Sequence, residues 1–247
     1  MKVKSCFAAL GIVLAFASTS HATKFSFGRP AITPEYVSDA ARVDILGIKP
    51  GMKAKEVKAV IRLHFPGEKI EEASAAFGSG ENQTRRYRSG LTVSKTTKSS
   101  KDTISVEFGS PGIGSEATLV TRSSELNYKR QRPTIDAMVA QMTKEFGTPA
   151  TVDKTRNAVS LEWHYGSGSC KRISNLHPYE FYSPLQGKDY MKEAKSGCDV
   201  IVKASIRATP FANDGRARFV DVAVYDIKRR AINAKVDARL LKVMQDN

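Results

Sequence analysis

Serine, histidine and acidic side chains, the groups that hydrolases use for catalysis, occur here without a catalytic pattern. The sequence lacks a GxSxG motif, which presents a serine nucleophile on a sharp turn after a strand. Segment 166–169 (GSGS) follows His164, but His164 occupies a polar strand position, where a solvated histidine is the usual case. Glu71 and Glu72 are adjacent acids of a kind common on surfaces. We predict no catalytic residues and keep a hydrolase with an unrecognised site as a second alternative.

The N-terminal segment 1–22 has the pattern of a secretory signal peptide. Two lysines precede an apolar run from Cys6 to about Ala17, and small residues follow up to Ala22. The run is too short for a membrane anchor, which needs ~20 residues. We predict cleavage near Ala22, although a cut after Ala17 also fits, and a mature protein that is periplasmic or secreted. No later segment is long and apolar enough to span a membrane.

Two cysteines, Cys170 and Cys198, remain after this cleavage. An exported chain with two cysteines favours a disulfide, and closing a loop of this size stabilises by roughly 3–4 kcal/mol. A redox or metal pair is the alternative. The chain contains no CxxC, however, and His64, His164 and His177 lack ligand spacing. We predict a structural disulfide, no metal site and no cofactor.

The chain is strongly basic, with a formal net charge of +14 at pH 7. The excess is spread over both halves and favours attraction to anionic partners, although a soluble basic envelope protein has the same composition. No nucleic-acid-binding motif is present, and an exported protein rarely meets nucleic acid. The predicted partner is therefore an unknown envelope protein or an anionic envelope component.

Two segments are candidate binding sites. The densest basic segment could bind phosphate or carboxylate groups, or could be a solvated strand edge whose cations discourage edge-to-edge pairing. Its candidate anion-binding residues are Arg85, Arg86, Arg88, Lys95 and Lys98. The segment within the expected disulfide loop contains Tyr179, Phe181 and Tyr182. These rings could pack the loop onto a sheet, or could bind a partner, since aromatic anchors are typical of interfaces.

Two amphipathic helices are expected to position these groups. A turn at Pro50-Gly51-Met52 precedes the first, in which Val57, Val60, Ile61 and Phe65 recur at helical spacing. The second covers residues 134–146, with Thr134 as its N-cap. A shift of 81 residues aligns Phe65 with Phe146 and most of the apolar positions. An internal duplication and a chance similarity both explain this alignment.

Each helix precedes segments in which apolar and polar residues alternate, as half-buried strands do. These segments lie near 87–93, 103–108, 116–121, 158–165, 198–207 and 219–225. A final helix over 228–244 has Ile232, Val236, Leu240 and Val243 on one face. It could lie on an anionic membrane or pack on the sheet.

The fold class is therefore α+β, with two helix-plus-antiparallel-sheet units, each a two-layer sandwich. An extended lead-in (23–43) precedes the first unit (44–131). The second unit (132–247) contains the disulfide loop and the C-terminal helix.

The pattern of Gly47, Ile48, Gly51-Met52 and Glu56-Val57 before a helix and antiparallel strands resembles the outer-membrane assembly lipoproteins of the BamE/SmpA kind. A tandem pair of such units resembles the β-lactamase inhibitor proteins (BLIP). Lys53 replaces the family's usual Ser/Thr helix cap, and no lipid-bearing cysteine follows the signal, so membrane anchoring does not carry over. The resemblance implies non-catalytic protein binding.

We therefore predict an exported, non-enzymatic binding protein of the bacterial cell envelope, in envelope assembly or as an inhibitor. The alternative is a peripheral binder of anionic lipid, lipopolysaccharide or cell-wall polymer.

Overall fold

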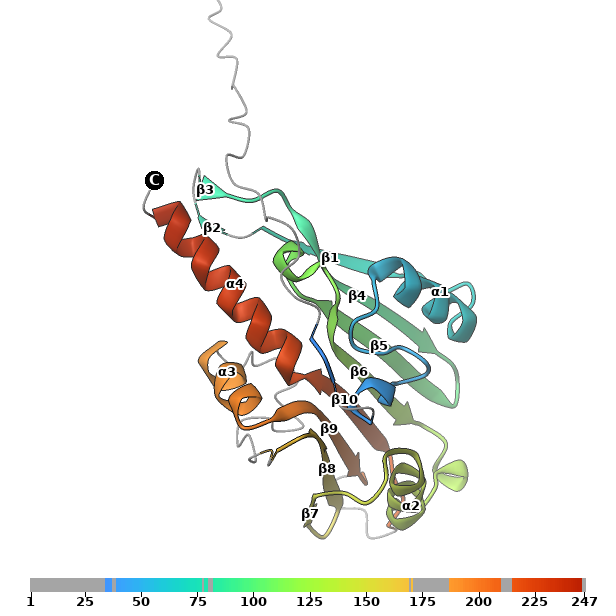
Figure 1. The fold of residues 1–247 in the computed structure, drawn as a ribbon. Helices are drawn as coiled ribbons and strands as arrows, with labels where there is room; N and C mark the ends of the chain where they lie inside the picture. Colours follow the sequence, from blue (N-terminus) through green and yellow to red (C-terminus); the bar gives the residue numbers. More distant parts are fainter. Residues whose placement is uncertain are drawn as a thin grey trace, which may run out of the picture.

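The computed structural model describes residues 34–36, 39–76, 78–79, 82–168, 170, 187–209 and 215–245. Within these ranges the chain forms four α-helices, an eight-stranded antiparallel sheet and a small hairpin of β2 (Gly78–Ser79) and β3 (Asn82–Gln83) (Figure 1). The helices are α1 (Ala54–His64), α2 (Ile135–Phe146), α3 (Gly187–Lys195) and α4 (Ile227–Gln245). The strands of the large sheet are β1 (Glu71–Ala75), β4 (Tyr87–Thr96), β5 (Ser100–Phe108), β6 (Ala117–Leu126), β7 (Thr151–Lys154), β8 (Ala158–Gly166), β9 (Cys198–Arg207) and β10 (Phe219–Asp226).

The strands of both predicted units join in one continuous sheet. Its order is β1-β4-β5-β6-β10-β9-β8-β7, so four strands from the first range lie beside four from the second. The two sets meet where β6 pairs with β10, from Leu119 opposite Tyr225 to Glu125 opposite Phe219. We call this central pair the seam.

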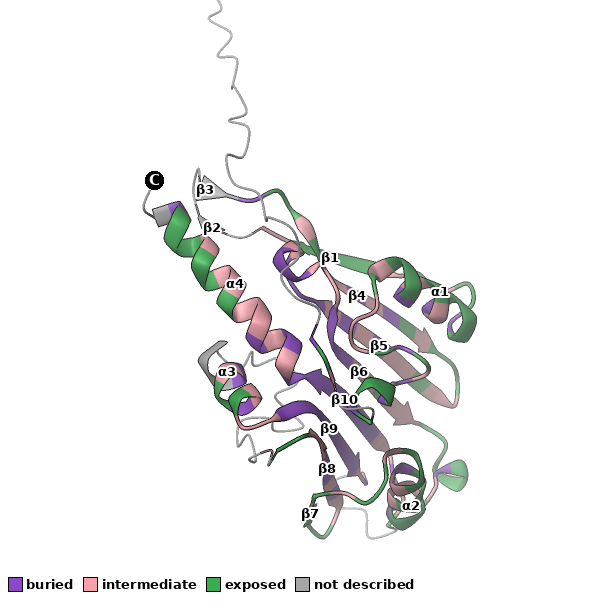
Figure 2. Cartoon of the chain, viewed as in Figure 1, coloured by how far each residue is buried: buried purple, intermediate pink, exposed green. Residues whose placement is uncertain are grey.

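The two faces of the sheet are covered by different helices (Figure 1). On one face, alternate strand residues such as Ile104 and Val202 form the main core with Val57 and Ile61 of α1 and with Met142 of α2. On the other face, a smaller cluster joins the sheet to α3 and α4. Its members include Leu119, Ile201, Tyr225, Tyr190, Ile227 and Ala231. Burial is therefore greatest in β9 and β10, which have core on both sides (Figure 2).

The predicted helices and the six predicted strands are confirmed as α1, α2, α4, β4, β5, β6, β8, β9 and β10. Strands β1 and β7 and helix α3 were not predicted. The described part of the lead-in contains a 3-10 turn (Ala40–Arg42), and Ala40 and Val43 are buried, so this part packs on the core instead of being simply extended.

The predicted apolar face of α4 is confirmed only in part: Ile232, Val236 and Leu240 are half-buried, whereas Val243 is exposed. Val243 is 51% exposed, and the buried residues of the described helix are Ile227, Arg229, Ala231 and Met244. The deepest burial is instead at the start of the helix, where Arg229 pairs with Asp226. The fully buried Asp226 carboxylate caps it by accepting hydrogen bonds from the Arg229 backbone N–H (2.8 Å) and from Arg229 Nε (3.0 Å).

The turn before α1 fixes the direction in which this helix leaves the sheet. Gly51 has φ +88°, a left-handed conformation that glycine adopts without strain. Its N–H donates to the Ala117 carbonyl (2.8 Å), and the Ala117 N–H donates to the Met52 carbonyl (2.9 Å). The turn is thereby fastened to the first residue of β6, next to the seam.

Candidate binding site

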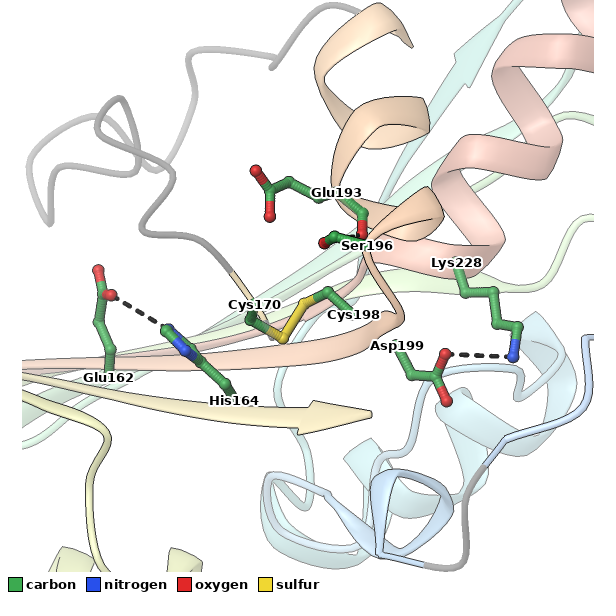
Figure 3. Close-up of a disulfide and its surroundings, with 8 residues drawn as sticks. All are labelled: Glu162, His164, Cys170, Glu193, Ser196, Cys198, Asp199 and Lys228. Carbon is green, nitrogen blue, oxygen red and sulfur yellow. Dashed lines mark hydrogen bonds and ion pairs between the residues drawn. A yellow bond between two sulfur atoms is a disulfide. The ribbon is translucent and has the colours of Figure 1, made fainter. Parts of the chain in front are cut away.

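The predicted disulfide is present. Cys170 and Cys198 are joined, with their Cα atoms 4.8 Å apart. The bond lies where β8 ends and β9 begins, between the Glu162–His164 pair and the Asp199–Lys228 ion pair (Figure 3). The predicted partner-binding residues Tyr179, Phe181 and Tyr182 lie outside the described residues, so their role stays a prediction.

Three charged or titratable side chains lie together beside the disulfide. Lys203 Nζ is 2.7 Å from Glu162 Oε1, and His164 Nε2 is 3.4 Å from Glu162 Oε2. Burial alone would raise the pKa of Glu162, but the hydrogen bonds from His164 and Lys203 lower it to about 2. Within the described residues, no serine hydroxyl is hydrogen-bonded to His164. The arrangement is an ion-pair cluster on a strand face.

The five predicted anion-binding residues are divided between the two ends of β4. Arg85, Arg86 and Arg88 lie at its start, and Arg88 forms an ion pair with Glu72 of β1 (2.6 Å). Lys95 lies near its end, and Lys98 lies in the following turn. A ten-residue strand is ~33 Å long. The structure therefore does not bring the two groups into one anion site.

A groove between α2 and the Ile45–Ile48 turn is a concave site with a mainly apolar lining. Its cavity has a volume of about 350 Å³. The floor is the seam, with Leu126, Val220 and Val222, and one wall is α2. The other wall is the turn at Ile45–Ile48, which comes before the Gly51 turn in the chain. The lining residues from the walls and floor are Ile45, Leu46, Arg122, Ser124, Gln131, Pro133, Met138, Gln141, Met142, Glu145 and Phe146. We call this site the inter-helix groove.

The groove is mainly apolar, with charge at one end. There Arg122 is already engaged, since its guanidinium donates to both carboxylate oxygens of Asp102 (3.0 and 2.8 Å). Glu145, in contrast, is an exposed residue at the mouth of the groove, and its side chain makes no hydrogen bond or ion pair with another described residue. Burial and the nearby Asp44 carboxylate raise the pKa of Glu145, while Arg122 acts in the opposite direction. A second cavity of about 300 Å³ adjoins this end and shares Glu145 and Phe146.

A strained turn forms the wall that faces α2. Ile45 and Ile48 exchange two backbone hydrogen bonds (3.1 and 3.0 Å), and Leu46 and Gly47 between them have φ of +55° and +82°. Such a turn is usually made with asparagine, aspartate or glycine, because a left-handed leucine costs about 1–2 kcal/mol. Strain of this kind often marks functional sites. Here it holds the Leu46 side chain against the groove.

Sequence reasoning missed the groove because its lining comes from four separate stretches of the chain. Ile45–Leu46, the end of β6, α2 with the loop before it, and β10 meet only after the seam has formed. The leucine in the Leu46-Gly47 turn is a local signal that could have pointed to this wall.

Other classes of site and similarity are not found. The described residues contain no group of three or more His, Cys, Asp or Glu side chains that could hold a metal ion. In the same part of the chain, no helix has the length and apolar character needed to cross a membrane. Comparison of the chain with protein-family models, curated proteins and solved structures gives no match.

Proposed function

We propose that the protein is an exported, non-enzymatic binding protein of the bacterial cell envelope, and that it holds an apolar anchor residue of a protein partner in the inter-helix groove. The observation that carries this proposal is the groove itself, an apolar cavity with a strand floor and a polar rim. Interface hot spots have this form, because an anchor gains most where it is fully desolvated.

The construction of the groove also supports binding. Its floor belongs to the central strands of the sheet, and Val222 is only 7% exposed, so the floor is rigid. Met138 and Met142 on α2 are unbranched and can adapt to the shape of an anchor. A preformed pocket with an adaptable wall lowers the entropic cost of binding. The disulfide is compatible with an extracytoplasmic location.

We further infer that the fold arose by tandem duplication, as in the BamE-like and inhibitor-like arrangement. The residues just before α1 and the residues just before α2 form backbone hydrogen bonds with the chain at the start of, or just before, a seam strand, β6 for α1 and β10 for α2. Lys53 pairs with Glu116 and Thr134 with Arg216 as isolated bridges, and these two helix N-caps are the positions that the 81-residue shift aligns. The bonds from Ala117 N–H to Met52 O and from Ala217 N–H to Pro133 O are both 2.9 Å. The groove would then lie between the two copies.

Site-specific photo-cross-linking tests the binding proposal. Gln141, exposed on the rim of the groove, is replaced by p-benzoylphenylalanine, and Lys55, exposed on α1, is the matched control position. In cells irradiated during growth, we expect a protein adduct of defined mass from position 141 that position 55 does not give. Adding Met138→Gln should reduce this adduct, and because Met138 is partly buried against the core, the melting temperature of the variant is measured alongside to separate lost binding from lost stability.

Other outcomes would contradict the proposal. Equal adducts from both positions would mean that the groove is not selective. Adducts with lipid or polymer alone would favour the peripheral binder of anionic envelope components.

A further inference from the structure

We propose that the inter-helix groove recognises a protein segment in which a large apolar side chain lies next to a lysine or arginine. This inference rests on the proposed function and makes it more specific. The apolar side chain occupies the cavity over the seam, and the cationic group binds the Glu145 carboxylate at its end.

The first step is the charge that the groove leaves unpaired. Glu145 and Asp44 are both acidic and lie close enough to repel each other. Asp44 uses one oxygen to accept the Gly47 N–H (2.7 Å), while Glu145 has no hydrogen-bonding partner among the described residues. Arg122 compensates only in part, because its Nε and one Nη2 hydrogen already bind the Asp102 carboxylate, which offsets its charge. A ligand cation would relieve the repulsion and pair with Glu145.

The second step is the contrast with the rest of the chain. The protein carries a formal charge of +14, so its overall field repels cations. The adjoining cavity nevertheless is lined by three acids, Asp39, Asp44 and Glu145, against one base, Arg42. This local reversal of sign, beside an apolar cavity, selects a ligand that is both apolar and cationic.

The third step is the geometry of the two cavities. They share Glu145 and Phe146, so these two side chains lie at the boundary between the apolar cavity and the acidic one. An anchor in the first cavity therefore places the next residue of an extended segment near Glu145. A single isolated cation or a neutral apolar group would satisfy only one of the two cavities.

The test uses the methionine methyl groups as reporters. Met138 and Met142 line the groove, whereas Met191 and Met244 lie elsewhere in the fold. Full-length mature protein with labelled methionine methyl groups is titrated with three blocked tripeptides, acetyl-Leu-Leu-Lys-amide, acetyl-Leu-Leu-Gln-amide and acetyl-Leu-Leu-Glu-amide. We expect saturable shifts of the Met138 and Met142 signals, with the lysine peptide binding about tenfold more tightly than the glutamine peptide.

Three variants make the result specific. Glu145→Gln should abolish the preference for lysine, while Glu71→Gln, an exposed acid on the edge strand β1, should retain it. Leu46→Gly removes one wall and should weaken all three peptides. Equal binding of the three peptides would overturn the charge inference and leave the proposed function standing. No shift of Met138 or Met142 with any peptide would overturn both.

Discussion

At the scale of single residues, the clearest constraint is the glycine of the turn before α1. A Cβ atom on Gly51 would lie 2.8 Å from Arg229 Nη2, and Arg229 is held in place by Asp226 and Glu116. Gly51→Ala therefore adds a steric conflict to the cost of a left-handed alanine, which is about 1–2 kcal/mol. We expect a loss in the free energy of unfolding, measured by denaturant titration, that exceeds this backbone cost because Arg229 must shift out of its ion pairs.

Gly67 provides a matched control for this prediction. It has φ +81°, nearly that of Gly51, but a Cβ atom there would meet nothing within 4 Å. Gly67→Ala should therefore show the backbone cost alone. Equal losses for the two variants would mean that the contact with Arg229 relaxes without cost.

The pKa of Glu162 predicts how acid destabilises the protein. Its folded pKa of about 2 lies below the ordinary value of 4.5. The corresponding stabilisation is therefore fully present above pH 4.5 and is lost as the pH falls through 2. The shift amounts to at most about 3 kcal/mol. The difference in unfolding free energy between wild type and Glu162→Gln should shrink by up to this amount between pH 6 and pH 2.

The comparison of wild type with Glu162→Gln needs a control variant in which a different acidic residue is replaced. Glu71→Gln, on the exposed edge strand, controls for the loss of one carboxyl group. A gap between wild type and Glu162→Gln that stays constant from pH 6 to pH 2 would show that the contacts with Lys203 and His164 do not act through ionised Glu162.

At the scale of elements, helices and strands could be predicted from the sequence wherever buried apolar residues recur at the regular spacing of a helix or a strand. The helices α1 and α2 and the alternating strands were predictable because one face of each packs on the core. The edge strands β1 (EEASA) and β7 (TVDK) were not, since they are short, polar and largely exposed. Helix α4 was predicted, but the burial of Arg229 near its start was not, because this side chain pairs with acids that lie far away in sequence or precede the helix.

The disulfide is the element-scale feature whose contribution is easiest to isolate. It joins residues 28 apart in sequence at the junction of β8 and β9. Replacing Cys170 and Cys198 by alanine should lower the free energy of unfolding by roughly 3 kcal/mol. Reductant should destabilise the wild type by a similar amount and leave the variant unchanged. If reductant had no effect on either protein, the bond would not contribute to stability.

At the scale of the whole molecule, the seam decides whether the protein behaves as one domain or two. A sequence pattern can indicate two similar units, but it does not specify whether their sheets join. Here β6 and β10 lie at the centre of the sheet, and Val120 and Val224, opposite each other across it, are fully buried. Separating the units would expose this core and break the backbone hydrogen bonds of the seam. The groove, which has the seam as its floor, would be lost as well.

We therefore expect the two halves to unfold together. Trp163, the only tryptophan, is 2% exposed in β8, and its indole N–H donates to the Gly147 carbonyl (2.7 Å). Its fluorescence reports on the second half, whereas far-ultraviolet circular dichroism reports on all strands and helices. In a two-state transition both signals have the same midpoint. A fluorescence transition separated from part of the dichroism change would show that the halves are independent domains, and the seam would then be a contact between domains.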